Sequence, residues 1–230
     1  MCIRDRLLVL EDGAAVLHES IGWSDRERAL PLRRNSIFRI RSMTKPLLGT
    51  AVLMLMEDGE LSLDDPVAQY LPSFDNDRSR SITIRQLLTH TSGLGNHGEE
   101  DIGLPRPGDE YATLRELVDD IGEIGPTRPP GEFHYSDSGS ATLGALVAEV
   151  SGMPLRRFIE RRILEPLGMR DTHTRFDPAV PWAARMNSTY RWTREACGFE
   201  RYWEPSRDQR FRYFRAVSYT HLRAHETVLD

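Results

Sequence analysis

Lys45 is the single lysine of a 230-residue chain whose 29 other cationic residues are arginines, and it follows Ser42 by three positions. Arginine keeps its proton near neutral pH, whereas a buried lysine can release one and so act as a base or activate a nucleophile. One alternative is a surface lysine in an arginine-rich coding background. We favour the chemical interpretation, because chance seldom places a serine three residues before a lone lysine.

The expected secondary structure brings these two side chains together. We expect a helix from Ser42 to about Asp58, ended by Gly59. Residues three positions apart share a helix face, and the free NH groups at a helix start favour negative charge on Ser42. Apolar residues surround most of this helix, so we expect it to be buried on nearly all sides.

The rest of the chain reads as strands followed by helices. Two strands are expected within 7–19, joined by a tight turn at Asp12-Gly13, and another within 37–40. A loop with one helical turn is expected over 61–74. One helix is expected over 83–89 and another over 155–164. Between them, one helix is expected to begin after the cap Thr113, and a separate helix is expected to end at Gly152. We expect no further strand between Thr172 and 216.

Both ends of the chain resemble translated sequencing adapter. Residues 1–5 and 217–221 can be encoded by opposite strands of one short DNA. We therefore interpret 1–6 and 217–230 as adapter-derived scars and 7–216 as a partial domain, with the first strands in 7–41 and a mostly helical part in 42–216. Localisation stays open, because an export signal could have been lost.

Composition excludes several classes of function. The net charge is −5, and arginines alternate with acidic residues without forming a basic block, which argues against a nucleic-acid partner. Outside the scars Cys197 is the only cysteine, so neither a disulfide framework nor a zinc site is expected. No apolar run is long enough to span a bilayer, and we expect a soluble globular protein without metal or cofactor. Oligomeric state stays open.

Four motifs occur in a fixed order along the chain, namely Phe38-x-x-x-Ser42-Met43-Thr44-Lys45, Leu87-Leu88-Thr89-His90-Thr91-Ser92-Gly93-Leu94, Pro130-Gly131-Glu132-Phe133-x-Tyr135-Ser136 and Pro166-Leu167-Gly168-Met169-x-Asp171-Thr172. Together they resemble the serine β-lactamase-related and penicillin-binding family, in its class C and esterase-like branch. The resemblance covers nearly all of 7–174.

The resemblance implies an α+β, β-lactamase/transpeptidase-like fold, in which an antiparallel sheet with flanking helices carries an inserted all-α domain. It implies acyl transfer with Ser42 as nucleophile, Lys45 as activator and Tyr135 as a second proton carrier. The residues alone do not decide whether Lys45 or Tyr135 holds the proton. The expected substrate is a small-molecule or peptide-like compound with an ester, amide or β-lactam carbonyl.

Two departures from the family pattern bear on this expectation. Asp137 stands where the family usually has asparagine, so a substrate-binding amide is replaced by a carboxylate that accepts hydrogen bonds but donates none when ionised. We expect altered substrate preference rather than loss of activity. No Lys-Thr-Gly or His-x-Gly motif follows Tyr135, so we expect the C-terminal strands of the sheet to be missing.

Other candidates receive a structural interpretation or stay open. His90 could be a base, but a histidine at a helix end more often bonds local backbone, and we favour that structural role. No G-x-S-x-G elbow supports a Ser-His-Asp enzyme built on Ser92. His134 and Trp192 either line the site or pack, and Glu132 and Phe133 shape the loop that bears Tyr135. The alternatives to a hydrolase are a sensor-type relative that acylates without turnover and an inactive fragment.

Overall fold

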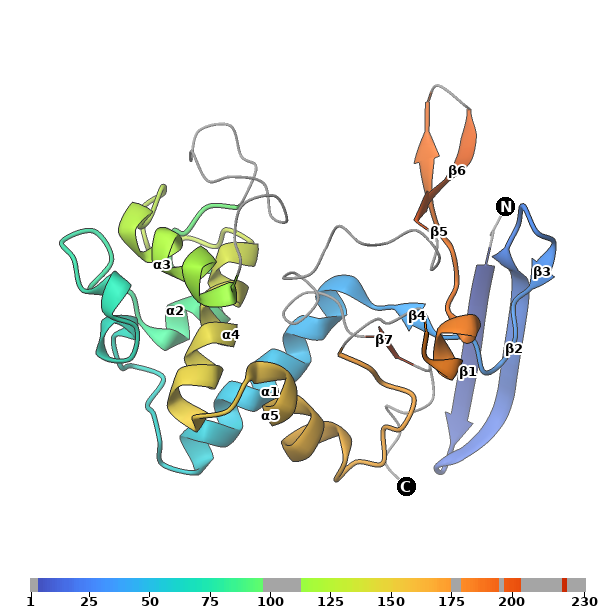
Figure 1. Ribbon diagram of the computed structural model, residues 1–230, viewed down its shortest axis with the longest axis horizontal. Coiled ribbons are helices and arrows are strands. Elements are labelled where there is room, and N and C mark those ends of the chain that lie inside the picture. Colours follow the sequence, from blue (N-terminus) through green and yellow to red (C-terminus); the bar gives the residue numbers. More distant parts are fainter. Residues whose placement is uncertain (1–3, 97–112, 175–178, 195–196, 204–220, 223–230) are drawn as a thin grey trace. The chain divides into compact units, whose positions relative to one another are not determined.

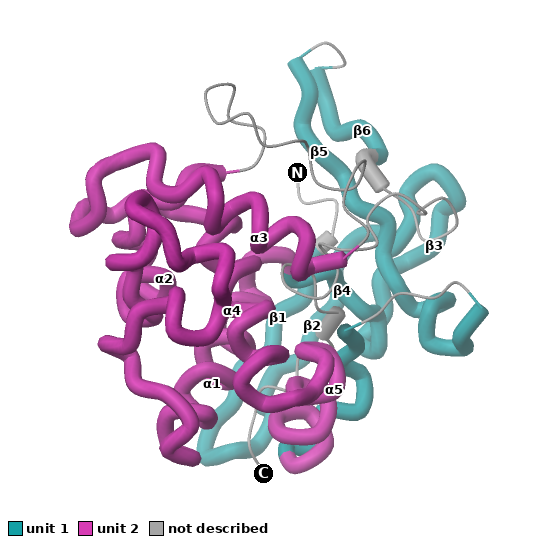
Figure 2. The backbone as a smooth tube through the Cα atoms, turned by 60° about the vertical axis from the view of Figure 1, so that its left-hand side comes forward, with its two compact units in different colours: residues 1–40, 167–209, 220–230 teal, residues 41–166, 210–219 magenta. Residues whose placement is uncertain are grey.

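The computed structural model describes residues 4–96, 113–174, 179–194, 197–203 and 221–222. Contacts divide the chain into two compact units (Figure 2). Unit 1 contains 1–40, 167–209 and 220–230, and unit 2 contains 41–166 and 210–219. The chain therefore leaves unit 1 directly before Ser42 and returns to it at Leu167.

The main sheet of unit 1 begins with a long hairpin. Strand β1 (Arg4–Glu11) pairs antiparallel with β2 (Ala14–Asp25), and β3 (Leu30–Pro31) adds a third strand (Figure 1). Asp12 and Gly13 have φ of 50° and 79°, as a two-residue hairpin turn with matching twist requires. The predicted hairpin is confirmed. Several of its apolar side chains are exposed, among them Leu7, Val16 and Ile21.

A second hairpin in unit 1 corrects the sequence analysis. Strands β5 (Thr189–Thr193) and β6 (Gly198–Trp203) pair antiparallel. The expectation that no strand follows Thr172 is therefore wrong. Strand β4 (Phe38–Arg39), within the predicted 37–40, pairs with β7 (His221–Leu222), which lies in the segment interpreted as adapter-derived. A 3₁₀ turn, η5 (Pro181–Arg185), contributes Ala183 to a small core with Ile37 and Met186.

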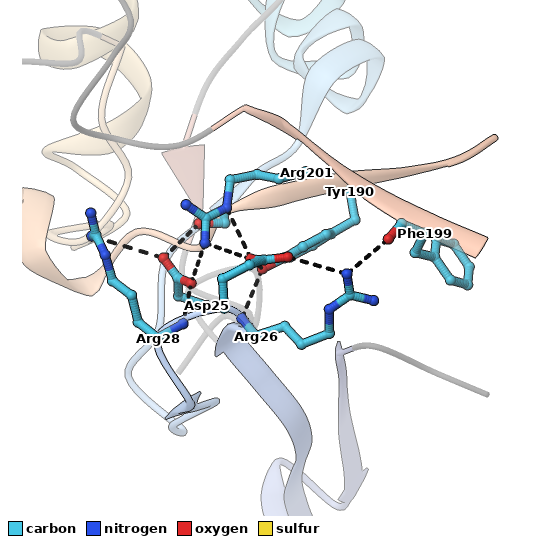
Figure 3. A network of polar contacts seen from close by, with 8 residues as sticks. Asp25, Arg26, Arg28, Tyr190, Phe199 and Arg201 are labelled. Carbon is cyan, nitrogen blue, oxygen red and sulfur yellow. Dashed lines mark hydrogen bonds and ion pairs between the residues drawn. The ribbon is translucent and has the colours of Figure 1, made fainter. Parts of the chain in front are cut away.

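Charged side chains connect the two hairpins of unit 1 (Figure 3). Arg201 on β6 donates to Asp25 at the end of β2, at 2.6 Å, and its Nε donates to Glu27 at 3.0 Å. The Tyr190 hydroxyl donates to Glu27 at 2.6 Å and accepts from the Arg26 NH at 2.8 Å. These bonds join residues more than 160 positions apart.

Unit 2 is helical and is built around α4 (Asp137–Ser151). Helix α4 contacts α1 (Thr44–Glu57), α2 (Ile84–Leu88), α3 (Leu114–Ile124) and α5 (Leu155–Ile159) (Figure 1). All ten residues from Ser138 to Val147 are buried. Small residues such as Gly139, Ala141 and Gly144 occupy several of these positions, which leaves room for neighbouring helices on every side.

The predicted helices are present, with adjusted boundaries. Thr83 and Thr113 form capping boxes with Gln86 and Glu116, and Gly152 ends α4 in the left-handed conformation. The predicted helix 155–164 consists of α5 followed by a single π turn, η4 (Glu160–Leu164). The loop 61–74 holds two 3₁₀ turns instead of one, η2 (Val67–Gln69) and η3 (Pro72–Phe74).

Helix α1 differs from expectation in two respects. It begins at Thr44 rather than Ser42, which lies in the preceding 3₁₀ turn η1 (Arg41–Met43). Its burial is one-sided: Leu48, Val52 and Leu55 are buried, whereas Leu53 is 42% exposed. The expectation of a helix buried on nearly all sides is wrong, because one face of α1 lacks the packing partners that its composition suggested.

Candidate active site

Ser42 and Lys45 meet at the start of α1. Lys45 is the second residue of the helix, and the η1 turn directs Ser42 toward it. The Lys45 Nζ lies 3.5 Å from the Ser42 Oγ. This distance is long for a hydrogen bond, but bonds of this kind often shorten when substrate binds. The spacing of three residues thus gives the contact that the sequence predicted.

Asp137 is the closest polar partner of Lys45. The Asp137 Oδ1 lies 2.5 Å from the Lys45 Nζ, so the ammonium is held mainly by this ion pair and only secondarily by Ser42. The Lys45 side chain is 13% exposed and that of Asp137 is 39% exposed. The Lys45 side chain is therefore largely shielded from solvent, whereas the Asp137 side chain is partly exposed.

Tyr135 completes the cluster through its ring. The Lys45 Nζ lies 4.7 Å from the centre of the Tyr135 ring, within the range of a cation–π contact. Tyr135 is 40% exposed. All four residues predicted for the site, Ser42, Lys45, Tyr135 and Asp137, are therefore brought together within unit 2.

Side chains from the segment after α2 bind one backbone group on each of three consecutive residues, Tyr135, Ser136 and Asp137. The Asn96 Nδ2 donates to the Tyr135 carbonyl at 2.9 Å, and the Asn96 Oδ1 accepts from the Asp137 NH at 2.7 Å. Between them, the His90 Nδ1 accepts from the Ser136 NH at 3.2 Å. Ser136 also caps α4 through a bond from the Gly139 NH at 3.0 Å. The start of α4 is thus fixed from both sides.

His90 accepts a hydrogen bond from backbone, but its partner Ser136 is distant in sequence and not local as expected. Its ring centre lies 4.7 Å from that of Tyr135 and 6.0 Å from that of Phe133. Burial and the nearby Lys45 charge lower the pKa of His90 below its usual value of 6.5, while Asp137 acts in the opposite direction. The imidazole beside Tyr135 is therefore neutral at neutral pH.

Backbone conformation is unusual at two positions in this cluster. Arg41, directly before Ser42, has φ of +50°, and His90 has φ of +57°. Residues with side chains seldom adopt this left-handed conformation, and such positions concentrate at functional sites. The chain accepts strain at the residue preceding Ser42 and at the residue that binds the Tyr135 segment.

The remaining candidates fall into two groups. Phe133 is 72% exposed and contacts His90 edge-on, which fits a role in the Tyr135 loop. Trp192 lies on β5 in unit 1 and packs against Phe199, and Ser92 is buried. Asn96 was not predicted, because a lone asparagine in a glycine-rich passage carries no periodic or spacing signal. Much of that passage, 97–112, lies outside the described residues.

The family model named beta-lactamase matches residues 6–208. This chain belongs to the β-lactamase family. The match contains the Ser42 cluster, that is Ser42, Lys45, Tyr135 and Asp137. It confirms the resemblance carried by the four motifs.

Individual relatives agree with this assignment. The chain is 37% identical over 169 residues to a putative penicillin-binding protein, PbpX, of Bacillus subtilis, covering 74% of this chain and 40% of the relative. It is 35% identical over 176 residues to the esterase EstB of Burkholderia gladioli, covering 71% of this chain and 45% of the relative. The chain thus spans less than half the length of these two β-lactamase-family relatives.

Solved structures confirm the fold class. EstCE1, described as a hydrolase with promiscuous acyltransferase activity, superposes with a TM-score of 0.80 at 24% identity, over 97% of this chain and 65% of that one. The fold is α+β and β-lactamase/transpeptidase-like. Across the described residues, no helix has the length and apolar character to cross a bilayer, and no three His, Cys, Asp or Glu residues are grouped as metal ligands.

Proposed function

We propose that the full-length protein containing this chain is a serine hydrolase that works through an acyl-enzyme on Ser42. The observation that carries the proposal is the 3.5 Å approach of the Lys45 Nζ to the Ser42 Oγ, beside the ring of Tyr135. A serine next to a cation that also contacts a phenol ring has near it both a candidate partner for its proton and a group that stabilises the resulting charge.

In the acylation step, the Ser42 Oγ forms a bond to the substrate carbonyl carbon while its proton passes to the Lys45–Tyr135 pair. The bond from that carbon to the leaving group then breaks, and the leaving group takes the proton. Water next attacks the acyl carbon and gives a proton to the same pair. The bond from that carbon to the Ser42 Oγ then breaks, the Oγ takes the proton from the pair, and a carboxylic acid is released. The tetrahedral oxyanion of each step binds the Ser42 NH.

Lys45 and Tyr135 divide this work according to charge. With Asp137 at 2.5 Å, Lys45 acts mainly as a fixed ammonium that stabilises a phenolate on Tyr135. Tyr135 is then the group that carries the proton between Ser42 and the leaving group. The ion pair with Asp137 holds the Lys45 amine in place rather than leaving it free to act as the base.

The substrate class is a carbonyl compound small enough to reach Ser42, namely an ester, an amide or a β-lactam. A second candidate function is a sensor-type relative that forms a stable acyl-enzyme. The observation that favours it is the same Lys45–Asp137 ion pair, because a strongly held ammonium slows activation of the deacylating water.

Labelling of the full-length protein tests the proposal. A fluorophosphonate probe or a fluorescent penicillin is expected to label the wild type, while Ser42→Ala abolishes labelling and Lys45→Arg lowers its rate about 100-fold or more. Labelling followed by recovery of free enzyme supports a hydrolase, and stable labelling supports the sensor. Absence of labelling with both probes contradicts both functions.

A second oxyanion donor is expected on a strand that carries Lys-Thr-Gly or His-x-Gly in the family, and this chain has neither motif after Tyr135. Residues 7–216 alone are therefore expected to label weakly, because loss of one oxyanion donor costs about 100- to 1000-fold in rate. Rapid turnover by this segment would contradict that expectation.

A further inference from the structure

We propose that His90 is a positioning residue whose neutral imidazole holds Tyr135 in place, so that protonation of His90 switches the site off. The inference rests on the proposed function, because it concerns the group assigned there as proton carrier. It adds a residue that does not touch the reacting atoms and a pH dependence that the Ser42 cluster alone does not predict.

The first argument is the pattern of backbone bonds. Asn96 binds the Tyr135 carbonyl and the Asp137 NH, and His90 binds the Ser136 NH between them. A side-chain amide and an imidazole thus bind backbone groups of three consecutive residues, Tyr135, Ser136 and Asp137. Because Ser136 is 1% exposed, water cannot readily replace the His90 bond.

The second argument is that His90 contacts the Tyr135 side chain as well as its backbone. The two ring centres lie 4.7 Å apart with an angle of 34° between the planes. Tyr135 also makes the cation–π contact with Lys45. A shift of His90 is therefore expected to change the position of the Tyr135 phenol relative to the Lys45 ammonium.

The third argument concerns which nitrogen of the His90 imidazole carries the proton. The bond to Ser136 requires a lone pair on the His90 Nδ1, so the ring proton must sit on Nε2. A protonated imidazole carries hydrogen on both nitrogens and faces the Ser136 NH with another donor. Protonation therefore turns the attractive contact between the His90 Nδ1 and the Ser136 NH into a repulsive one.

The charges around His90 set the direction of the switch. Lys45 from α1 opposes protonation of His90, and Asp137 from the start of α4 favours it. Tyr135 contributes an uncharged ring, and the His134 NH donates to the His90 carbonyl. Together with burial, these groups lower the pKa of His90. The positioned state is therefore present at neutral pH and is lost as the pH falls through the pKa of His90.

The backbone at His90 provides a matched pair of variants. Glycine and asparagine both tolerate φ of +57°, so neither adds strain. In His90→Asn the side-chain oxygen can replace Nδ1 as acceptor but does not titrate. In His90→Gly the acceptor is absent.

Both variants are compared with wild type in the full-length protein, using the second-order rate of Ser42 labelling by a fluorophosphonate from pH 5 to 9. At pH 8 we expect His90→Gly to be slower by about 10- to 100-fold, because a displacement of about 1 Å costs this much, and His90→Asn to be close to wild type. Lys45 and Tyr135 are present in both proteins, so the wild-type to His90→Asn rate ratio isolates the contribution of His90. We expect this ratio to fall below about pH 6.5.

Hydrogen exchange of the backbone NH groups in 135–137 gives a readout that needs no activity. We expect faster exchange in His90→Gly than in His90→Asn at the same pH. A rate ratio that stays constant with pH, or equal labelling by wild type and His90→Gly, overturns the proposal. If no protein is labelled at all, the proposed function fails, and equal exchange in the two variants then also overturns the positioning role.

Discussion

The decisive residue-level feature is the competition between two partners for Lys45. Asp137 lies 2.5 Å from its Nζ and Ser42 lies 3.5 Å from it, so the carboxylate dominates the electrostatics of the site. An asparagine at 137 would provide no charge but could donate a hydrogen bond through its amide. Asp137 therefore places a group that only accepts hydrogen bonds when ionised near Ser42.

The first prediction concerns substrate preference. In Asp137→Asn we expect turnover of a chromogenic β-lactam, relative to an aryl ester, to rise about fivefold, because the new amide donates one hydrogen bond worth roughly 1 kcal/mol to the β-lactam side chain. Steady-state kcat/KM for both substrates is the measurement.

Asp137→Ala is the control, since it removes the charge without adding a donor. If Asp137→Ala raises the ratio as much as Asp137→Asn, charge rather than the donated bond sets the preference.

At the level of elements, small residues in unit 2 allow neighbouring segments to pack closely against its helices. In α3, a Cβ added at Gly122 would lie 2.7 Å from the Phe74 Cδ2 and 2.8 Å from the Ser73 carbonyl oxygen. The Gly122 carbonyl also accepts from the Ser79 Oγ at 2.6 Å. Helix α3 thus packs directly against the η3 turn through a position that has no room for a side chain.

The second prediction follows from that contact. We expect Gly122→Ala to lower the free energy of unfolding by about 1 to 3 kcal/mol through overpacking, despite the better helix propensity of alanine. Urea denaturation is the measurement.

Gly49→Ala is the matched control in α1, where the new Cβ meets only the Leu88 Cδ2 at 3.9 Å. This variant is expected to be neutral or to stabilise by up to about 1 kcal/mol. Equal effects of both variants would show that helix propensity, and not the Phe74 contact, decides the outcome.

For the whole molecule, the main feature is a chain whose first unit is assembled from distant segments. The contacts of Arg201 with Asp25 and Glu27 connect parts of unit 1 that are separated in sequence by residues 41–166 of unit 2. Burial raises the pKa of Glu27, but hydrogen bonds from Tyr190 and Arg201 outweigh it and lower that pKa to about 2. The lowered pKa of Glu27 is therefore specific to the folded unit.

The third prediction is an acid-dependent loosening of unit 1. A depressed carboxyl pKa contributes stability that is present above the unfolded value of about 4.3 and is lost as pH falls toward the folded value. We expect amide exchange in 189–194, corrected for the intrinsic pH effect, to accelerate between about pH 4.5 and 2. Glu27→Gln should lose this part of the pH dependence.

Arg201→Met is the companion variant, since it retains a long side chain without the charge. We expect it to accelerate exchange in 189–194 at neutral pH. Unchanged exchange in both variants across the pH range would indicate that the hairpin does not depend on these bonds.

Local signals explain which parts of the fold were predictable. Asp12-Gly13 specifies its turn through its own backbone, and Thr83 and Thr113 cap their helices within four residues. Strands β5 and β6 were missed although Tyr190 and Trp192 favour strands, because their pairing is supported by partners such as Asp25 and Glu27 far away in sequence. Long-range support of this kind leaves no periodic pattern.

By itself, the sequence determined the Ser42–Lys45 contact, since a spacing of three residues on a helical turn brings side chains together in any context. Only the tertiary structure decided that Asp137 would take Lys45 as its partner and that His90 and Asn96 would hold Tyr135. Those contacts join α1, the segment after α2 and the start of α4, and their positions follow from helix packing around α4. Packing depends on the whole set of buried side chains, which no local motif contains.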